Sequence, residues 1–355
     1  MCGARQPEAP RPTALPPSGA SPISSDPVVV PQEESAAPFP DLGARRFLFV
    51  TGKGGVGKTT VAGALALALG ERGKRVLVAM CHTKERLSAI LGVAPIGDEI
   101  VSVGRNVWAV NIDPEKALEE YGGLVLKVRA VTRAVFDNKY TKAFFRAVPG
   151  LYEWSMLGKA WWHTTETTAG GGHRFDVVLL DAPATGHGLD MLRVPKVILD
   201  VVPPGVLRRD AQAAWDLFRD ARRSGVLVVT LPEEMPTTET LELAASIEVE
   251  LTLPIVGLVV NGVLPQLFSE AEAEALVAVP ELLDLAAPLT ARDGEAALVA
   301  GARRAVRERV QRESLEKLRV ESRLPRLSLP FLFDEASTVE GTRMLAQRLR
   351  TCIKS

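Results

Sequence analysis

Short apolar runs alternate with helical stretches from Arg45 onward. Most of these runs are apolar at nearly every position, which is the pattern of strands buried on both faces of a parallel sheet. We predict seven strands, at residues 46–51, 75–80, 106–112, 175–181, 225–230, 254–261 and 324–329. Strands that alternate with helices in this way indicate an α/β fold, with a doubly wound and mainly parallel sheet flanked by helices.

One interval, residues 113–172, breaks this alternation. It contains no clear strand, and it holds three of the five tryptophans, Trp154, Trp161 and Trp162. Asp113-Pro114 is a favourable start for a helix, because the aspartate can cap it and proline suits its first turn. We therefore predict a helical insertion over about 113–172, continued by residues 204–223.

The first 43 residues differ in composition from the rest of the chain. They hold 10 of the 25 prolines and no lysine, so they bury too little apolar surface to offset the entropy lost on ordering. We predict a disordered segment over 1–43 and one folded domain over 44–355. The formal net charge of −1 gives no electrostatic basis for nucleic acid or an anionic membrane as the main partner.

The three cysteines, Cys2, Cys81 and Cys352, are scattered along the chain and form no CxxC pair. They therefore predict neither a disulfide framework nor a zinc site. No apolar run approaches the length of a membrane-spanning helix, and the N-terminus lacks a basic and apolar leader. These features predict a cytoplasmic protein.

The segment FVTGKGGVGKTT, residues 49–60, contains a phosphate loop. Gly52, Gly57, Lys58 and Thr59 have the GxxxxGK[ST] spacing between a predicted strand and a predicted helix. Backbone N–H groups of such a loop curl around phosphate oxygens, and the helix N-terminus adds the positive end of its dipole. Lys58 is expected on the β- and γ-phosphates and Thr59 on Mg²⁺. The predicted nucleotide-binding residues of the loop are Gly52, Lys53, Gly54, Gly55, Val56, Gly57, Lys58, Thr59 and Thr60.

The second lysine of this loop, Lys53, gives it a resemblance to a known class. GKGGVGKTT resembles the deviant Walker A motif of the P-loop NTPases that include MinD, ParA, the nitrogenase iron protein and the ArsA-type ATPases. In that class the early lysine reaches across a dimer interface to the partner's nucleotide. The resemblance therefore implies a catalytic Lys53 and a homodimer that closes around two nucleotides; the alternative is a solvated lysine.

Residues 175–195, FDVVLLDAPATGHGLDMLRVP, resemble the signature of the ArsA and tail-anchored-protein targeting factor ATPases. The resemblance extends over about residues 45–355. Asp181 ends a predicted strand, where a carboxylate can hold Mg²⁺ through water. The signature matches at Pro183, Thr185, Gly186 and His187 and departs at Ala182, Ala184 and Gly188. For His187 two roles stay open, a sensor of the γ-phosphate and a packed or turn-capping histidine.

The resemblance implies ATP and Mg²⁺ as cofactors. The NKxD motif of GTPases is missing after the strand that carries Asn261. In relatives, the asparagine that closes this strand faces adenine, so Asn261 is the predicted adenine contact. The segment 329–335 is expected to cover the other face of the base.

The segment after the second strand, VAMCHTKERLSAILG (78–92), departs from the family pattern. It has His82 where the family has the aspartate that orients the attacking water. A neutral imidazole can orient water or accept a proton, but it supplies no fixed negative charge. Three hypotheses stay open: His82 does this job, Glu85 replaces it, or hydrolysis is very slow or lost. The predicted catalytic residues are thus Lys53, Lys58, His82 and Asp181.

Several functions remain open from the sequence. The first is a homodimeric, Mg-ATP-dependent switch that moves the helical insertion to bind or release a protein client. The tryptophans of the insertion motivate it, although they also fit core packing. The others are an ATP-binding scaffold with impaired hydrolysis, a MinD-like membrane-positioning ATPase with a basic C-terminal helix (340–355), and a metabolic kinase or synthetase.

The cysteine content narrows the first of these functions. The chain lacks the cysteines that bind metalloid in the arsenite-pump ATPase, and it has no CxxC for a zinc-clasped dimer or an iron–sulfur cluster.

The length of the helical insertion also bears on client binding. The 20 residues of 204–223 make a short insertion, so we expect a reduced groove for a client helix.

Overall fold

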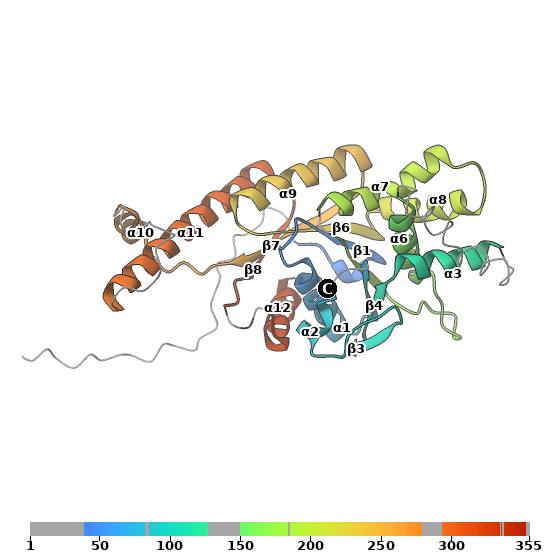
Figure 1. Cartoon of the computed structure of the whole chain (residues 1–355), viewed down its shortest axis with the longest axis horizontal. Coiled ribbons are helices and arrows are strands. Elements are labelled where there is room, and N and C mark those ends of the chain that lie inside the picture. The colour runs from blue at the N-terminus through green and yellow to red at the C-terminus, as the bar shows by residue number, and fades with distance from the viewer. Residues whose placement is uncertain are drawn as a thin grey trace, which may run out of the picture.

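The computed structural model describes residues 39–81, 85–126, 150–183, 185–278, 293–333, 335 and 337–352. Within these ranges the chain forms one eight-stranded sheet with helices on both of its faces (Figure 1). The predicted α/β fold, a mainly parallel sheet flanked by helices, is confirmed.

The sheet has the strand order β3-β4-β2-β5-β1-β6-β7-β8. Every neighbouring pair is parallel except β3 and β4. The seven predicted strands are all present, and β3 at the edge of the sheet was not predicted. The strands are β1 (Phe47–Thr51), β2 (Val76–Cys81), β3 (Val101–Gly104), β4 (Val107–Ile112), β5 (Val177–Asp181), β6 (Ser224–Thr230), β7 (Ile255–Val263) and β8 (Arg326–Pro330).

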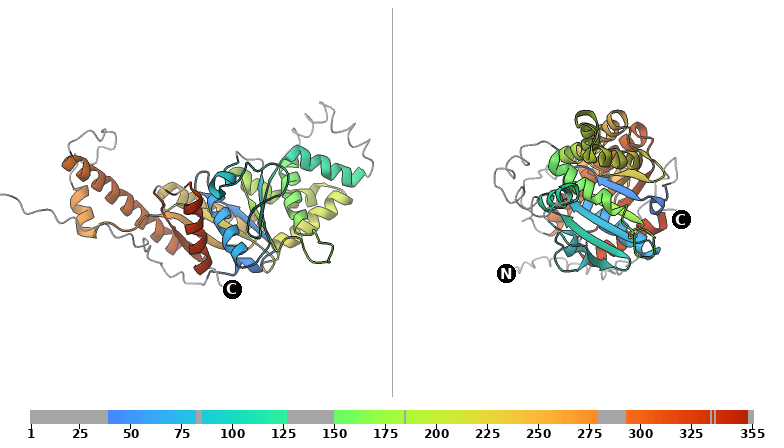
Figure 2. Two further views of the ribbon diagram at one scale, coloured as in Figure 1. Left: turned by 90° about the horizontal axis from the view of Figure 1, so that it is seen from below. Right: turned by 90° about the vertical axis from the view of Figure 1, so that its right-hand side faces the viewer.

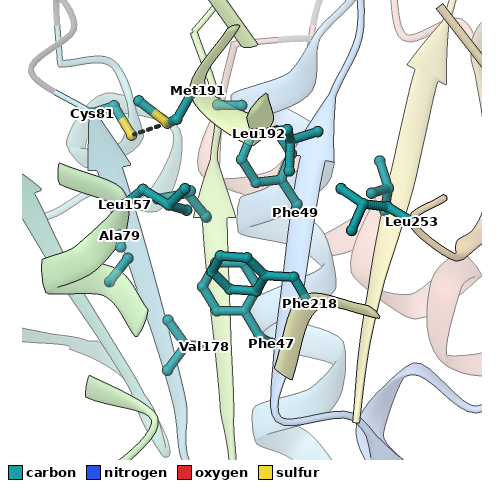
Figure 3. Close-up of a cluster of buried hydrophobic side chains, with 14 of the residues drawn as sticks. Phe47, Phe49, Ala79, Cys81, Leu157, Val178, Met191, Leu192, Phe218 and Leu253 are labelled. Atoms are coloured by element: carbon teal, nitrogen blue, oxygen red, sulfur yellow. Dashed lines mark hydrogen bonds between the residues drawn. The ribbon is translucent and has the colours of Figure 1, made fainter. Parts of the chain in front are cut away.

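The central strands are apolar throughout because both of their faces are covered. Every residue of β1, β2, β5 and β6 is buried. Successive side chains of β1 enter opposite core layers, Phe47 and Phe49 on one side and Leu48 and Val50 on the other. Figure 3 shows the first layer, where the rings of Phe47 and Phe218 lie 4.8 Å apart.

The helices divide between these two layers. Helices α1, α2 and α12 contribute to the layer that contains Leu48, and helices α3, α6, α7, α8 and α9 to the layer that contains Phe47. The helices are η1 (Leu42–Ala44), α1 (Lys58–Glu71), α2 (Leu87–Leu91), α3 (Pro114–Leu126), α6 (Leu151–His163), α7 (Thr185–Val201), α8 (Val206–Arg219), α9 (Glu234–Ser246) with its π-helical continuation η2 (Ile247–Leu251), α10 (Glu270–Val277), α11 (Asp293–Glu321) and α12 (Val339–Cys352).

The predicted helical insertion corresponds to α3 and α6, and the predicted continuation to α8. Residues 127–149 of the insertion lie outside the described residues.

A second helical insertion, between β7 and β8, was not predicted. Between β7 and β8, helices α10 and α11 form an arm that extends beyond the end of the sheet (Figures 1 and 2).

The described chain starts before the predicted domain boundary at residue 44. Phe39 and Leu42 are buried in the core. A Cβ atom on Gly257 of β7 would lie 2.6 Å from the Phe39 ring, so the missing side chain leaves the space in which Phe39 packs. Residues 1–38 of the predicted disordered segment lie outside the described residues.

Candidate nucleotide site

The phosphate loop joins β1 to α1 at the carboxyl edge of the sheet. Two of its glycines are required by close approaches. Gly52 has a φ of +150°, and a Cβ atom there would lie 2.1 Å from the carbonyl oxygen of Val229 in β6. Gly57 has a φ of +90°, and its Cβ would lie 2.3 Å from Asn261 Nδ2. The loop is therefore held between the ends of β6 and β7, and side chains at these two positions would displace it.

Lys58 starts α1 and turns back into the loop. Its Nζ donates hydrogen bonds to the carbonyl oxygens of Gly52 at 3.1 Å and Lys53 at 2.8 Å. Burial lowers the pKa of the Lys58 ammonium, and the nearby Asp181 carboxylate opposes this shift. The ammonium thus lies inside the loop, next to the N-terminus of α1, as the predicted phosphate contact requires.

Thr59 and Asp181 form the second part of the site. The Thr59 hydroxyl donates to Asp181 Oδ2 at 2.6 Å, from the first turn of α1 to the end of β5. Asp181 is 4 % exposed. Burial raises the pKa of its carboxyl to about 6, although the Thr59 hydrogen bond and the Lys58 charge both favour the ionised form.

The other oxygen of this carboxylate makes Asp181 a suitable Mg²⁺ residue. Oδ1 is buried and has no hydrogen-bond partner among the described residues. A buried acceptor without a donor is costly, and a hydrated cation would satisfy it. Since the described residues contain no cluster of three acidic, histidine or cysteine ligands, Thr59 and Asp181 would hold Mg²⁺ together with water and phosphate oxygens.

Lys53, the second lysine of the loop, points away from Lys58. Its ammonium forms an ion pair with Glu239 of α9 in the same chain. The two side chains are 29 % and 34 % exposed. Sequence reasoning missed Glu239, because nothing in the acidic segment 233–242 distinguishes it from its neighbours.

The predicted adenine contacts lie beside the loop. Asn261 Nδ2, on β7, donates to the carbonyl oxygen of Val56 at 2.9 Å. After β8, the rings of Phe331 and Phe333 meet edge to face at 4.9 Å, and both side chains are exposed. Phe331 lies 3.6 Å from the position of a Cβ atom on Gly262, the residue after Asn261. The structure thus brings Asn261 and the segment after β8 to the same edge of the loop.

The remaining predicted residues differ in how far the structure describes them. Gly54, Gly55 and Thr60 belong to the loop and the first turn of α1. His82 and the side chain of His187 lie outside the described residues. Glu85 lies just before α2, and its two carboxylate oxygens accept hydrogen bonds from the Ser88 backbone N–H at 2.7 Å and hydroxyl at 2.6 Å.

Comparison with known proteins places this loop in a family. Residues 45–203 match the family of anion-transporting ATPases. The chain is 27 % identical over 323 residues to the ATPase BagA of Mycobacterium tuberculosis, an alignment that covers 86 % of this chain and 94 % of that protein.

Two further relatives cover smaller parts of both chains. A putative arsenical pump-driving ATPase of Halobacterium salinarum is 31 % identical over 241 residues, which is 62 % of this chain and 36 % of that protein. The ATPase GET3 of Kluyveromyces lactis is 29 % identical over 160 residues, 43 % of this chain and 46 % of that protein. The resemblance predicted from the sequence is therefore confirmed: residues 45–203 match the anion-transporting ATPase family, and the chain is similar to arsenical pump-driving and GET3 ATPases.

Proposed function

We propose that this protein is a homodimeric, Mg-ATP-dependent switch whose opening and closing binds or releases a protein client. The observation that carries this proposal is the arrangement of Lys58, Thr59 and Asp181 at the carboxyl edge of the sheet. An inward-facing lysine and a hydroxyl–carboxylate pair converge there on the N-terminus of one helix. This arrangement fits a triphosphate with its metal ion.

Four side chains have distinct tasks in nucleotide binding. Lys58 exchanges its carbonyl acceptors on Gly52 and Lys53 for oxygens of the β- and γ-phosphates. Thr59 would hold Mg²⁺ through its hydroxyl, and Asp181 would hold it through water. Held there, the ion would neutralise negative charge on the phosphates during transfer. Asn261 recognises adenine from the end of β7, and the segment after β8 covers the base.

Lys53 has a task that a single copy of the chain does not complete. Its side chain points toward α9, away from the loop interior where Lys58 lies. In the proposed dimer, Lys53 contacts the nucleotide of the partner copy and stabilises negative charge there, as an arginine finger does. The dimer closes only when both sites hold ATP.

Water activation is assigned to His82 in this proposal. Glu85 already accepts two hydrogen bonds at the start of α2, and this favours His82 over Glu85 as the residue that orients water. An imidazole works as a base only when it is neutral. Turnover that rises when His82 is replaced by Asp would support the assignment, and unchanged turnover would contradict it.

The client surface is proposed on the helical insertion. Helices α3, α6 and α8 surround a hollow of about 770 Å³. All three tryptophans line the hollow, but Trp154 is buried in the core, whereas Trp162 is 44 % exposed. Trp154 thus serves core packing, and the other two tryptophans support an aromatic contact surface.

A nucleotide-binding scaffold without useful hydrolysis is the second candidate, because His82 replaces the family's aspartate. The MinD-like alternative gains no support, since the apolar residues Leu345, Ala346 and Leu349 of α12 are buried in the core. Among the described helices, none is long and apolar enough to span a bilayer.

Light scattering after size exclusion, together with a steady-state phosphate-release assay, tests the proposed function. With Mg²⁺ and a non-hydrolysable ATP analogue, the wild type is expected to become a dimer and Lys58→Ala to remain a monomer without turnover. Lys196→Ala, which changes an exposed lysine of α7, is the matched control. A wild type that stays monomeric would overturn the dimeric switch, and dimerisation without turnover would favour the scaffold.

A further inference from the structure

The ion pair between Lys53 and Glu239 joins two segments that are far apart in the sequence and firmly held in the fold. On one side, the loop starts at Gly52, which lies against the backbone of β6. On the other side, α9 packs on the sheet through Thr237 and Thr240, which are both buried. Because these anchors fix both backbones, the contact forms or breaks by movement of the two partly exposed side chains.

We propose that Glu239 is a positioning residue for Lys53. Within one copy of the chain, Glu239 holds the lysine against α9. Association of two copies must break this ion pair before Lys53 can reach the partner's phosphates. This inference rests on the proposed dimeric function and deepens it, because it names the group that Lys53 has to leave.

The negative charge of Glu239 suits the positioning of Lys53. The same charge disfavours a direct contact between Glu239 and the nucleotide. A carboxylate repels a triphosphate, so Glu239 can act on the site only through a cation. Its ion pair is partly exposed, and such pairs are weak in water. A triphosphate carries several negative charges and therefore competes successfully with one carboxylate for the same ammonium. The ion pair has to break and form again in every cycle of dimer closing and opening, and a weak contact allows this.

The position of Glu239 also connects the loop to the arm. Thr238, the preceding residue, accepts a hydrogen bond at 2.9 Å from Lys317 Nζ of α11. Helices α9 and α11 lie side by side (Figure 1). A change in the partner of Lys53 therefore takes place on α9, the helix that packs against α11 of the arm.

The test measures nucleotide-dependent dimerisation by sedimentation velocity with Mg²⁺ and a non-hydrolysable ATP analogue. Glu239→Gln removes the carboxylate charge and keeps the shape of the side chain. Glu239→Asp keeps the charge but withdraws it by one methylene, so the carboxylate no longer reaches Lys53 Nζ. Glu242→Gln makes the same charge change at an exposed position of the same helix.

Both Glu239 variants are expected to dimerise more tightly, because closure no longer has to break the ion pair. A weak ion pair corresponds to about a threefold effect per copy, so the dissociation constant of a dimer should fall by about tenfold. Glu242→Gln should match the wild type. Two results would overturn the proposal: an unchanged or weaker dimer in Glu239→Gln, or tightening in Glu239→Gln but not in Glu239→Asp. A wild type that never dimerises would instead refute the proposed function itself, and the positioning role with it.

Discussion

Asp181 is the residue at which stability and function are expected to oppose each other. Its carboxyl is almost fully buried, and burial raises its pKa from 3.8 to about 6. Replacement by asparagine keeps an acceptor for the Thr59 hydroxyl and removes the charge. We expect Asp181→Asn to lose Mg²⁺-dependent turnover and, in the absence of nucleotide and Mg²⁺, to gain stability relative to the wild type as the pH rises.

The size of this gain follows from the two pKa values. Below about pH 4 the carboxyl is largely protonated in both states, so folding costs little at this residue. Between about pH 4 and pH 6 the folded state retains a proton that the unfolded state releases, so rising pH disfavours the fold. Above both pKa values, the folded state bears the full free-energy cost of ionising the buried carboxyl. A difference of about 2 pKa units corresponds to roughly 3 kcal/mol, of which about 2–3 kcal/mol develops between pH 4 and pH 7.

Urea denaturation at a series of pH values, in EDTA and without nucleotide, measures this effect. The free energy of unfolding of Asp181→Asn minus that of the wild type should increase by about 2–3 kcal/mol between pH 4 and pH 7. Asp200→Asn, at an exposed position of α7, should show a difference that stays flat. If the difference in unfolding free energy for Asp181→Asn does not change with pH, the Asp181 carboxyl has an ordinary pKa. The argument that its buried negative charge needs Mg²⁺ is then wrong.

Three further predictions follow from the core and the loop. Phe47→Ala removes a buried ring that packs on Phe218, so urea denaturation should show a loss of about 3–5 kcal/mol, while Val201→Ala at an exposed position should be nearly neutral. Gly57→Ala places a methyl group against the Asn261 amide at a positive φ; isothermal titration with an ATP analogue should detect no binding, although thermal unfolding remains cooperative. Asn261→Ala should reduce the preference for ATP over GTP in the same titration, and an unchanged ratio would remove this residue from base recognition.

The sequence predicts the centre of this fold well because its signals there are local. Strands β1, β2, β5 and β6 are buried on both faces, and this requires continuous apolar runs that can be recognised without a structure. The phosphate loop is equally local, since its chemistry depends on the spacing of residues along one short segment.

The elements that were missed lack such a signal. Strand β3 has four residues, and Val101 and Ser102 are exposed at the edge of the sheet, so it produces no apolar run. Helices α10 and α11 bury small residues, including Ala273, Ala302 and Ala305, between many charged ones. This leaves only a weak apolar face in the sequence.

Some residues of the candidate site could be predicted from the sequence, and others could not. Lys58 and Thr59 are defined by the loop motif, and Asp181 by its position at the end of an apolar strand. Glu239 could not be predicted, because its role depends on how α9 lies across the loop. Four glutamates occupy residues 233–242, and only the fold distinguishes the one that reaches Lys53.

The length of α11 has a consequence for any motion that begins at the loop. Its 29 residues extend for about 44 Å at 1.5 Å per residue. A rotation of α11 by about 10° around its base would move the far end by about 8 Å over that length. A small rotation at the base of α11 therefore corresponds to a displacement at its far end that is nearly as wide as a helix.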